Sequence, residues 1–211
     1  MINNKTVIIS CAGVGKRLGR GIPKALVEVC GESMIIRTLK LLDEVEDVRI
    51  VVGYMADKVI EKVLSYRKDV IFVFNHDYLN TGTGASVFLA AKYAKDYILT
   101  IDGDIIVRPD DMKKLLEMKG EFVGVTDIST DDPVFVKVKD DMAMAFSRGE
   151  GQFEWTGVTQ LEKSHLGKTK EHTLSLVEPN LPLPIARIHL KEIDTENDFM
   201  VAYDWVKNDY R

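Results

Sequence analysis

Cysteine is scarce in this 211-residue sequence, which contains only Cys11 and Cys30. Their spacing fits neither a metal clip nor a redox pair, and two cysteines make no disulfide framework. We therefore expect a reducing compartment. Long apolar runs are also missing, since the first one, from Thr6 to Ala12, is too short for a signal-peptide core or a membrane span. These absences predict a cytoplasmic protein with no membrane insertion.

A basic excess is missing as well, because the formal net charge is -5. Proteins that bind nucleic acids or anionic membranes usually carry an excess of lysine and arginine, so we expect no nucleic-acid partner. The remaining composition, with 45% apolar and 29% charged residues, is that of an ordinary globular protein. The length suits one domain with a substantial core, and we expect a single domain over residues 1–211.

The first half of the chain alternates short apolar runs with helical patterns. The apolar runs predict strands at 6–12, 48–53, 70–74 and 97–101, and the periodic segments between them predict helices at 34–45, 57–66 and 85–94. Strict alternation implies right-handed crossovers, and therefore a parallel sheet with helices on both sides. Such three-layer α/β sheets bind ligands at the carboxyl ends of their strands.

The pattern changes after about Asp127. Short antiparallel strands are expected at 134–138 and 143–146, followed by a polar, turn-like stretch at 149–154. Three prolines mark a loop before a late strand at 185–190, and a helix at 197–206 follows. We expect a mostly parallel sheet with a small antiparallel extension that builds a lid or a pocket wall.

A glycine-rich, basic loop follows the first strand. Gly13 and Gly15 let backbone N–H groups approach an anion, and Lys16, Arg17 and Lys24 can neutralise a polyphosphate. The loop lacks the third glycine of a dinucleotide fingerprint and the Gly-Lys-Ser/Thr of a Walker loop. It is thus either a triphosphate site of another type or a plain strand–turn with surface lysines.

The segments AGVGKRL (12–18) and PKALVEV (23–29) resemble the signature of the nucleoside-diphosphate-sugar pyrophosphorylase superfamily. This resemblance implies a Rossmann-like nucleotidyltransferase fold. It also implies that Arg17 contacts the triphosphate and assists the leaving pyrophosphate, and that Lys24 holds the acceptor phosphate and the α-phosphate. The nucleotide-binding backbone would include Ala12, Gly13, Gly15 and Lys16.

A second glycine-containing loop, NTGTGAS (80–86), precedes a predicted helix. Its glycines permit close backbone approach, and Thr83 and Ser86 can hydrogen-bond a flat ring or cap the helix. In the superfamily that it resembles, the corresponding loop grips the nucleotide base. Gly82, Thr83, Gly84 and Ser86 match that pattern, while a helix cap with a flexible lead-in remains the alternative.

Two groups of carboxylates follow apolar strands. Asp102 and Asp104 lie two residues apart, so their side chains are expected on the same side of the chain, with Gly103 leaving room for a ligand. The resemblance implies that Asp102 contacts the nucleotide, and that Asp104 and Asp194 hold Mg²⁺, with Glu192 as a further acidic residue. The alternatives are a turn-capping pair for the first group and a helix N-cap for Asp194.

Within the superfamily, the chain looks most like small cytidylyltransferases that use inositol-1-phosphate or phosphocholine. The expected partners are CTP, or another nucleoside triphosphate, and a phosphorylated small acceptor. Glu154 and Trp155 fall where the family places its acceptor pocket, although Trp155 is equally compatible with a choline-stacking residue or a core aromatic. Sugar-1-phosphate transfer with UTP, dTTP or GTP and a non-catalytic nucleotide-sensing relative are the rival functions.

The remaining residue types indicate no other chemistry. The four histidines form no ligand pattern, and Cys11 is expected to be a buried strand residue rather than a nucleophile. Met142, Met144 and Phe146 are compatible with either a homodimer patch or the core.

Overall fold

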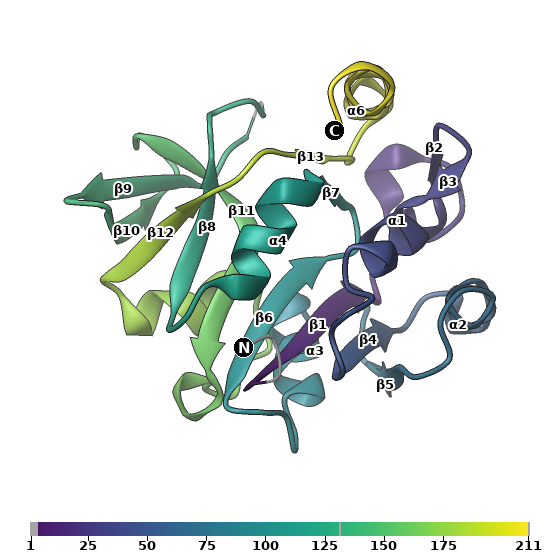
Figure 1. The fold of residues 1–211 in the computed structure, drawn as a ribbon, viewed down its shortest axis with the longest axis horizontal. Helices are drawn as coiled ribbons and strands as arrows, with labels where there is room; N and C mark the ends of the chain where they lie inside the picture. Colours follow the sequence, from purple (N-terminus) through teal and green to yellow (C-terminus); the bar gives the residue numbers. More distant parts are fainter. Residues whose placement is uncertain (1–3, 131, 211) are drawn as a thin grey trace.

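The computed structural model describes residues 4–130 and 132–210. Its main sheet contains β1 (Lys5–Cys11), β4 (Val48–Val52), β5 (Ile71–Phe74), β6 (Tyr97–Asp102), β8 (Phe122–Thr126), β9 (Phe135–Lys139), β10 (Met142–Ser147), β11 (Phe153–Glu162) and β12 (Leu183–Arg187). These nine strands are arranged in the order β5-β4-β1-β6-β11-β8-β12-β10-β9 (Figure 1). The first four form the parallel part that the alternating pattern predicts.

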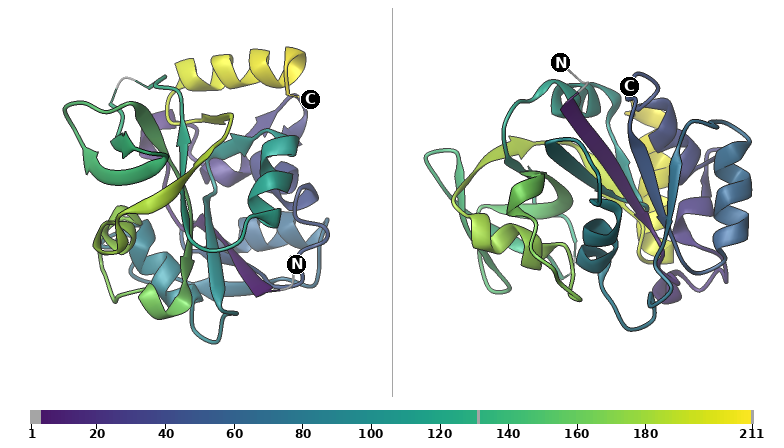
Figure 2. Two further views of the ribbon diagram at one scale, coloured as in Figure 1. Left: turned by 60° about the vertical axis from the view of Figure 1, so that its left-hand side comes forward. Right: turned by 90° about the horizontal axis from the view of Figure 1, so that it is seen from below.

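The parallel strands are covered on both faces. Val7 and Ile9 of β1 belong to one apolar cluster, with α1 (Met34–Lys40), α2 (Ala56–Leu64) and α4 (Pro109–Glu117). Ile8, between them, belongs to the cluster on the opposite face, with α3 (Thr83–Ala90) and α5 (Leu174–Val177). Figure 2 shows these two sets of helices on either side of the sheet. The predicted three-layer α/β fold is confirmed, and burial on both faces explains why Val7, Ile8 and Ile9 of β1 are apolar in succession.

The antiparallel part is larger than expected. β11 runs antiparallel to β6 and β8, and β9 pairs with both β10 and the first residues of β11. The strands β11, β8, β12, β10 and β9 therefore close into a ring beside the parallel strands. The expected turn at 149–154 ends two residues early, because Phe153 and Glu154 already pair with β9.

The late strand expected at 185–190 is interrupted. β12 ends at Arg187, and β13 (Leu190–Glu192) leaves the main sheet to pair with β7 (Ile105–Val107). The peptide N–H of His189, between the two strands, donates to the Asp111 carboxylate instead of a neighbouring strand. This interruption moves the chain from the main sheet to the edge where β6 ends.

The last helix, α6 (Glu196–Asn208), confirms the predicted C-terminal helix. It lies against the small ribbon of β2 (Glu28–Val29) and β3 (Glu32–Ser33), as Figure 1 shows. Its N-cap is Thr195, which forms a capping box with Asp198, so the alternative N-cap role considered for Asp194 is wrong. Within the described residues, no helix combines the length and apolarity needed to cross a bilayer.

Candidate active site

The basic loop lies at the carboxyl end of β1. Gly15 has a φ of 64°, and a Cβ atom there would come within 2.8 Å of the Lys24 side chain. The loop is therefore folded tightly onto Lys24, in a conformation that favours glycine. Two short 3-10 turns, Lys16–Leu18 and Lys24–Leu26, carry the three basic side chains that the sequence singles out.

The two groups of acidic residues meet through an antiparallel pair of strands outside the main sheet. β7 and β13 pair in antiparallel register, and the peptide N–H of Ile193 donates to the carbonyl oxygen of Asp104 at 2.9 Å. This pairing places Asp194 and Glu192 on either side of Ile193 and next to Asp104. A non-local antiparallel pairing of two three-residue strands leaves little signal in the sequence.

The basic and acidic groups interlock. The Lys24 ammonium donates to Asp104 Oδ2 at 2.8 Å and also to Asp194 Oδ1. Arg17 lies with one guanidinium nitrogen 2.5 Å from Asp194 Oδ2, although its side chain is 70% exposed. Burial opposes the charge on Lys24, but the nearby charge of Asp104 and hydrogen bonds with both carboxylates raise the pKa of Lys24 above its ordinary value.

Two of the acidic side chains at this centre have raised pKa values. Burial, followed by the charge of Asp104, raises the pKa of Asp102 to about 8. Burial, followed by the charges of Asp104 and Asp194, raises the pKa of Glu192 to about 8. Near neutral pH these two carboxyl groups are therefore largely protonated, and a bound cation would favour their charged forms.

The acidic cluster has the donor set that suits magnesium. Carboxylate oxygens of Asp104, Glu192 and Asp194 lie within 4.8 Å of one another. Magnesium prefers hard oxygen donors, usually one or two carboxylates together with phosphate oxygens. The geometry and the oxygen donors therefore fit the predicted pair Asp104 and Asp194, and they add Glu192 to the candidate ligands.

Two adjoining cavities open at this centre. The first, of about 640 Å³, contains the basic loop, Thr83 and the carboxylate cluster. The second, of about 310 Å³, extends toward Thr130, Glu154 and the start of α6. Both are lined by the same central residues, namely Arg17, Asp102, Val134, Arg148, Trp155, Glu192 and Asp194. The molecule therefore has two adjacent compartments that share a charged border.

The second glycine loop is used partly for packing. A Cβ atom on Gly82 would meet the Glu171 backbone at 2.5 Å, and one on Gly84 would meet the His172 carbonyl oxygen at 2.6 Å. The Ser86 hydroxyl is buried and accepts from Asn75 at 3.1 Å, whereas Thr83 lines the first cavity. Contact of Gly82, Gly84 and Ser86 with a base thus stays a prediction, and their shown partners are protein groups.

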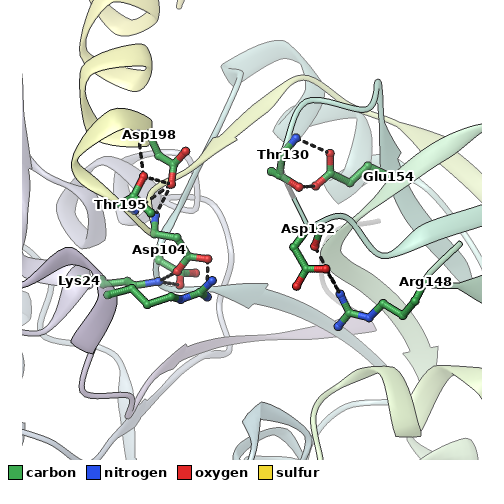
Figure 3. A network of polar contacts seen from close by, with 10 residues as sticks. Lys24, Asp104, Thr130, Asp132, Arg148, Glu154, Thr195 and Asp198 are labelled. Carbon is green, nitrogen blue, oxygen red and sulfur yellow. Dashed lines mark hydrogen bonds and ion pairs between the residues drawn. The ribbon is translucent and has the colours of Figure 1, made fainter.

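The two residues expected in the acceptor pocket differ in their surroundings. Trp155 lines both cavities and also packs edge-on against Phe146, with ring centroids 5.5 Å apart. The Glu154 carboxylate lines the second cavity, but it accepts from the peptide N–H groups of Ser129 and Thr130 and binds the Thr130 hydroxyl. Figure 3 shows this Glu154–Thr130 contact on the wall opposite Lys24. Glu154 thus fixes the loop that carries Asp132.

Other lining residues were not singled out by the sequence. Arg148 and Asp132 lie in polar turns without a motif, and nothing in their spacing indicates that they meet. Asp198 had a signal, since the Thr195-x-x-Asp198 spacing is typical of a capping box next to a candidate metal ligand. Cys11 is buried, and burial raises the pKa of its thiol, which fits the expected strand residue rather than a nucleophile.

The fold is that of solved nucleotidyltransferases. The inositol-1-phosphate CTP transferase from T. maritima has a TM-score of 0.82 at 19% identity, covering 99% of this chain and 98% of that chain. The CTP:phosphocholine cytidylyltransferase from Streptococcus pneumoniae has a TM-score of 0.77 at 20% identity, covering 96% of this chain and 99% of that chain. At these identities the likeness establishes the fold, which places the glycine-rich basic loop and the acidic cluster in a nucleotidyltransferase framework.

The chain belongs to the MobA-like NTP transferase domain family, whose model matches residues 7–151. The bifunctional protein GlmU of Helicobacter pylori (strain ATCC 700392 / 26695) is 30% identical over 127 residues, which cover 57% of this chain and 29% of that protein. The chain therefore spans less than a third of that relative. The resemblance that rests on AGVGKRL and PKALVEV is confirmed at the level of the family.

Proposed function

We propose that this protein transfers a nucleoside monophosphate from a nucleoside triphosphate to a small phosphorylated acceptor. The observation that carries the proposal is the charged border shared by the two cavities. A nucleotide in the larger cavity, with its phosphates on the loop at 12–17, would present its α-phosphate at that border. An acceptor in the smaller cavity would then approach the α-phosphate from the other side.

The reaction is an in-line displacement at phosphorus. An acceptor phosphate oxygen forms a bond to the α-phosphorus, and the bond to pyrophosphate breaks. Because both reactants are anions, the barrier is largely a matter of positioning and charge neutralisation. Arg17 would stabilise charge on the leaving pyrophosphate, and Lys24 would hold the acceptor phosphate and the α-phosphate. A phosphate monoester is already nucleophilic, so these roles require no general base.

Mg²⁺ is the cofactor that we infer, held by Asp104 and Asp194, with Glu192 adjacent. When bound, a divalent cation neutralises phosphate charge and orients the phosphates for displacement. In this structure the Lys24 ammonium forms ion pairs with both Asp104 and Asp194. These carboxylates would have to exchange their contacts with Lys24 for the cation, which would free the ammonium for phosphate.

The acceptor we favour is inositol-1-phosphate, with CTP as donor. The support is the hydrogen-bonding character of the smaller cavity, whose lining includes Thr130, Thr156, Thr195 and Asp198. A ring with several hydroxyl groups can satisfy such a lining. A trimethylammonium group prefers aromatic surroundings, and Trp155 is the one aromatic among the described lining residues.

Phosphocholine transfer is therefore the weaker alternative, and it depends on Trp155. A sugar-1-phosphate used with UTP, dTTP or GTP fits the same polar lining. A non-catalytic nucleotide sensor would be expected to lose charged residues from the site, whereas Arg17, Lys24, Asp104 and Asp194 are all present and mutually bonded. The single domain, the cytoplasmic location, the absence of a nucleic-acid partner and a homodimer through Met142, Met144 and Phe146 stay predictions.

The direct test is pyrophosphate release with CTP and Mg²⁺ in the presence of inositol-1-phosphate, phosphocholine, glucose-1-phosphate or no acceptor. Release with inositol-1-phosphate alone is the expected result. The same panel is repeated with UTP, dTTP and GTP. Release with another pair would overturn the choice of substrates but retain the reaction, and silence with every pair would favour a sensor.

A further inference from the structure

The two cavities receive their lysine and arginine side chains from opposite walls. In the described parts of the chain, 4–130 and 132–210, one wall is formed by the basic loop after β1. It provides Lys16, Arg17 and Lys24 from the turns Lys16–Leu18 and Lys24–Leu26. Arg148 comes from the turn between β10 and β11, across the opening. It lines both cavities, and Figure 3 shows it facing Lys24 and Asp104 from the far wall. None of the motifs that indicate a nucleotidyltransferase includes this residue.

The smaller cavity is rich in acidic side chains. Its lining includes the carboxyl groups of Asp102, Asp132, Glu154, Glu192, Asp194 and Asp198. A phosphorylated acceptor brings up to two negative charges into this surrounding, which is unfavourable unless cations lie nearby. Arg17 and Arg148 are the two lysine or arginine residues among the described lining residues. Arg17 is already committed to Asp194 at 2.5 Å.

Arg148, by contrast, is weakly held. Its guanidinium donates to the Asp132 carbonyl oxygen at 3.3 Å and to Asp132 Oδ1 at 3.4 Å. The two side chains are 65% and 89% exposed, and an exposed ion pair at this distance contributes little to stability. A phosphate can therefore displace the Asp132 carboxylate at small cost. It would gain the forked hydrogen bonds that guanidinium groups form with phosphate oxygens.

We propose that Arg148 binds the phosphate of the acceptor and that Asp132 holds the guanidinium beside the cavity until the acceptor arrives. This assignment rests on the proposed transferase function and identifies the residue that supplies positive charge to the acceptor side. Glu154 supports the arrangement indirectly, because it binds the backbone of the loop next to Asp132. Arg148 thus adds to acceptor affinity, whereas Lys24 contacts both phosphates and the loop at 12–17 binds the nucleotide.

The chain offers a closely matched control. Arg187 pairs with Asp127 Oδ1 at 3.4 Å, and its side chain is 65% exposed, as is that of Arg148. Arg187 lines neither of the two cavities. Arg148→Ala and Arg187→Ala therefore remove ion pairs of similar length and exposure, although Arg187 also lies over the Phe153 ring. They differ in their relation to the cavities.

The experiment measures KM for acceptor and for nucleotide in both variants and in Arg148→Lys. Arg148→Ala is expected to raise the acceptor KM about ten- to a hundredfold, the usual effect of losing a charge-assisted hydrogen bond. Its nucleotide KM should change less than about twofold, and Arg187→Ala should behave as wild type. Arg148→Lys keeps the charge but loses the fork, so an intermediate acceptor KM is expected.

A second variant tests whether Asp132 holds Arg148, and its acceptor KM is expected to change in the opposite direction. Asp132→Ala removes the carboxylate that competes for Arg148 and should lower the acceptor KM. An unchanged acceptor KM in Arg148→Ala, or an equal rise in both KM values, would overturn the inference while leaving the transferase function intact. A wild-type protein silent with every substrate pair would instead refute the proposed function and this inference with it.

Discussion

Lys24 lies between the two carboxylates proposed to hold a cation. Its ammonium contacts Asp104 and Asp194, and its side chain is 14% exposed. A positive charge thus already occupies the position where oxygen donors converge. Residues of the basic loop and of the acidic cluster satisfy one another in the free protein, so ligand binding exchanges ion pairs instead of filling an unpaired site.

Neutralising one of these carboxylates should reduce catalysis without removing the fold. Asp104→Asn keeps the shape of the side chain but loses the charge that pairs with Lys24 and would hold Mg²⁺. Turnover is expected to fall about 100-fold or more, in the range of other lost electrostatic contacts to reacting phosphates. Steady-state pyrophosphate release measures this effect. Asp127→Asn, at an exposed position, is the control, and near-normal turnover in Asp104→Asn would remove Asp104 from the centre.

Gly157 is required by close contact with Asp102. Its φ is +76°, and a Cβ atom there would lie 2.5 Å from Asp102 Oδ2. Gly157→Ala should therefore lower the free energy of unfolding by at least about 1 kcal/mol and displace Asp102 from the cavity border. Chemical denaturation and turnover both report the change. Gly167→Ala is the control, because no atom lies within 4 Å of its Cβ position, and equal stability of the two variants would contradict the argument.

At the residue scale, the sequence motifs predicted the residues of the basic loop and of the acidic cluster. They did not predict the residues on the opposite wall of the cavities. The spacing of Arg17, Lys24 and the Asp102–Asp104 pair follows from local sequence. The partners Arg148 and Asp132 come from irregular turns, whose positions depend on how β9, β10 and β11 curl into the ring. Buried structural contacts, such as the one between Ser86 and Asn75, also depend on packing that a local pattern does not encode.

At the scale of the elements, the short pair β7–β13 has the greatest effect on the site. It joins residues about 85 positions apart in the chain and brings Glu192 and Asp194 to Asp104. α6 begins directly after it, and the peptide N–H of Asp194 donates to Asp198 Oδ2 at 3.2 Å. The start of the last helix is therefore part of the support of the acidic cluster.

Removing the helix cap tests this support. Thr195→Ala loses the hydroxyl that accepts from the Asp198 peptide N–H, which is one half of the capping box. The free energy of unfolding should fall by about 1 kcal/mol, the usual effect of losing an N-cap. Urea denaturation measures it. Thr195→Ser keeps the hydroxyl and should remain within about 0.5 kcal/mol of wild type, and equal losses in the two variants would show that the cap contributes nothing.

The whole molecule combines a predictable half and a less predictable half. Periodicity identifies β1, β4, β5 and β6 and the helices between them, because strands of a parallel sheet covered on both faces carry runs of consecutive apolar residues. The second half was predicted only in part. α4 and β8 were not predicted, and β9 in the ring of strands mixes exposed and buried positions. The shape of the second half depends on pairing between strands that are far apart in the sequence, and local sequence patterns do not reveal such pairing.

Lys5, the first residue of β1, connects this strand to the end of α4. Its buried ammonium donates to the carbonyl oxygens of Leu115 and Met118, at 3.1 Å each. Burial lowers the pKa of Lys5 from 10.5 to about 8. Between these two pH values the unfolded chain binds more protons than the folded one. The Lys5 contribution to the free energy of unfolding must therefore rise with pH in this window, by up to about 1.4 kcal/mol per pH unit.

Chemical denaturation of wild type and Lys5→Met across pH 7 to 10.5 tests this linkage. Groups that titrate identically in both proteins cancel in the difference. The stability of wild type relative to Lys5→Met should be constant below pH 8 and should increase above it, because the folded lysine releases its proton first. Lys137→Met, which removes an exposed lysine, is expected to keep the wild-type slope. Parallel curves for wild type and Lys5→Met would mean that the ammonium is not desolvated at the junction of β1 and α4.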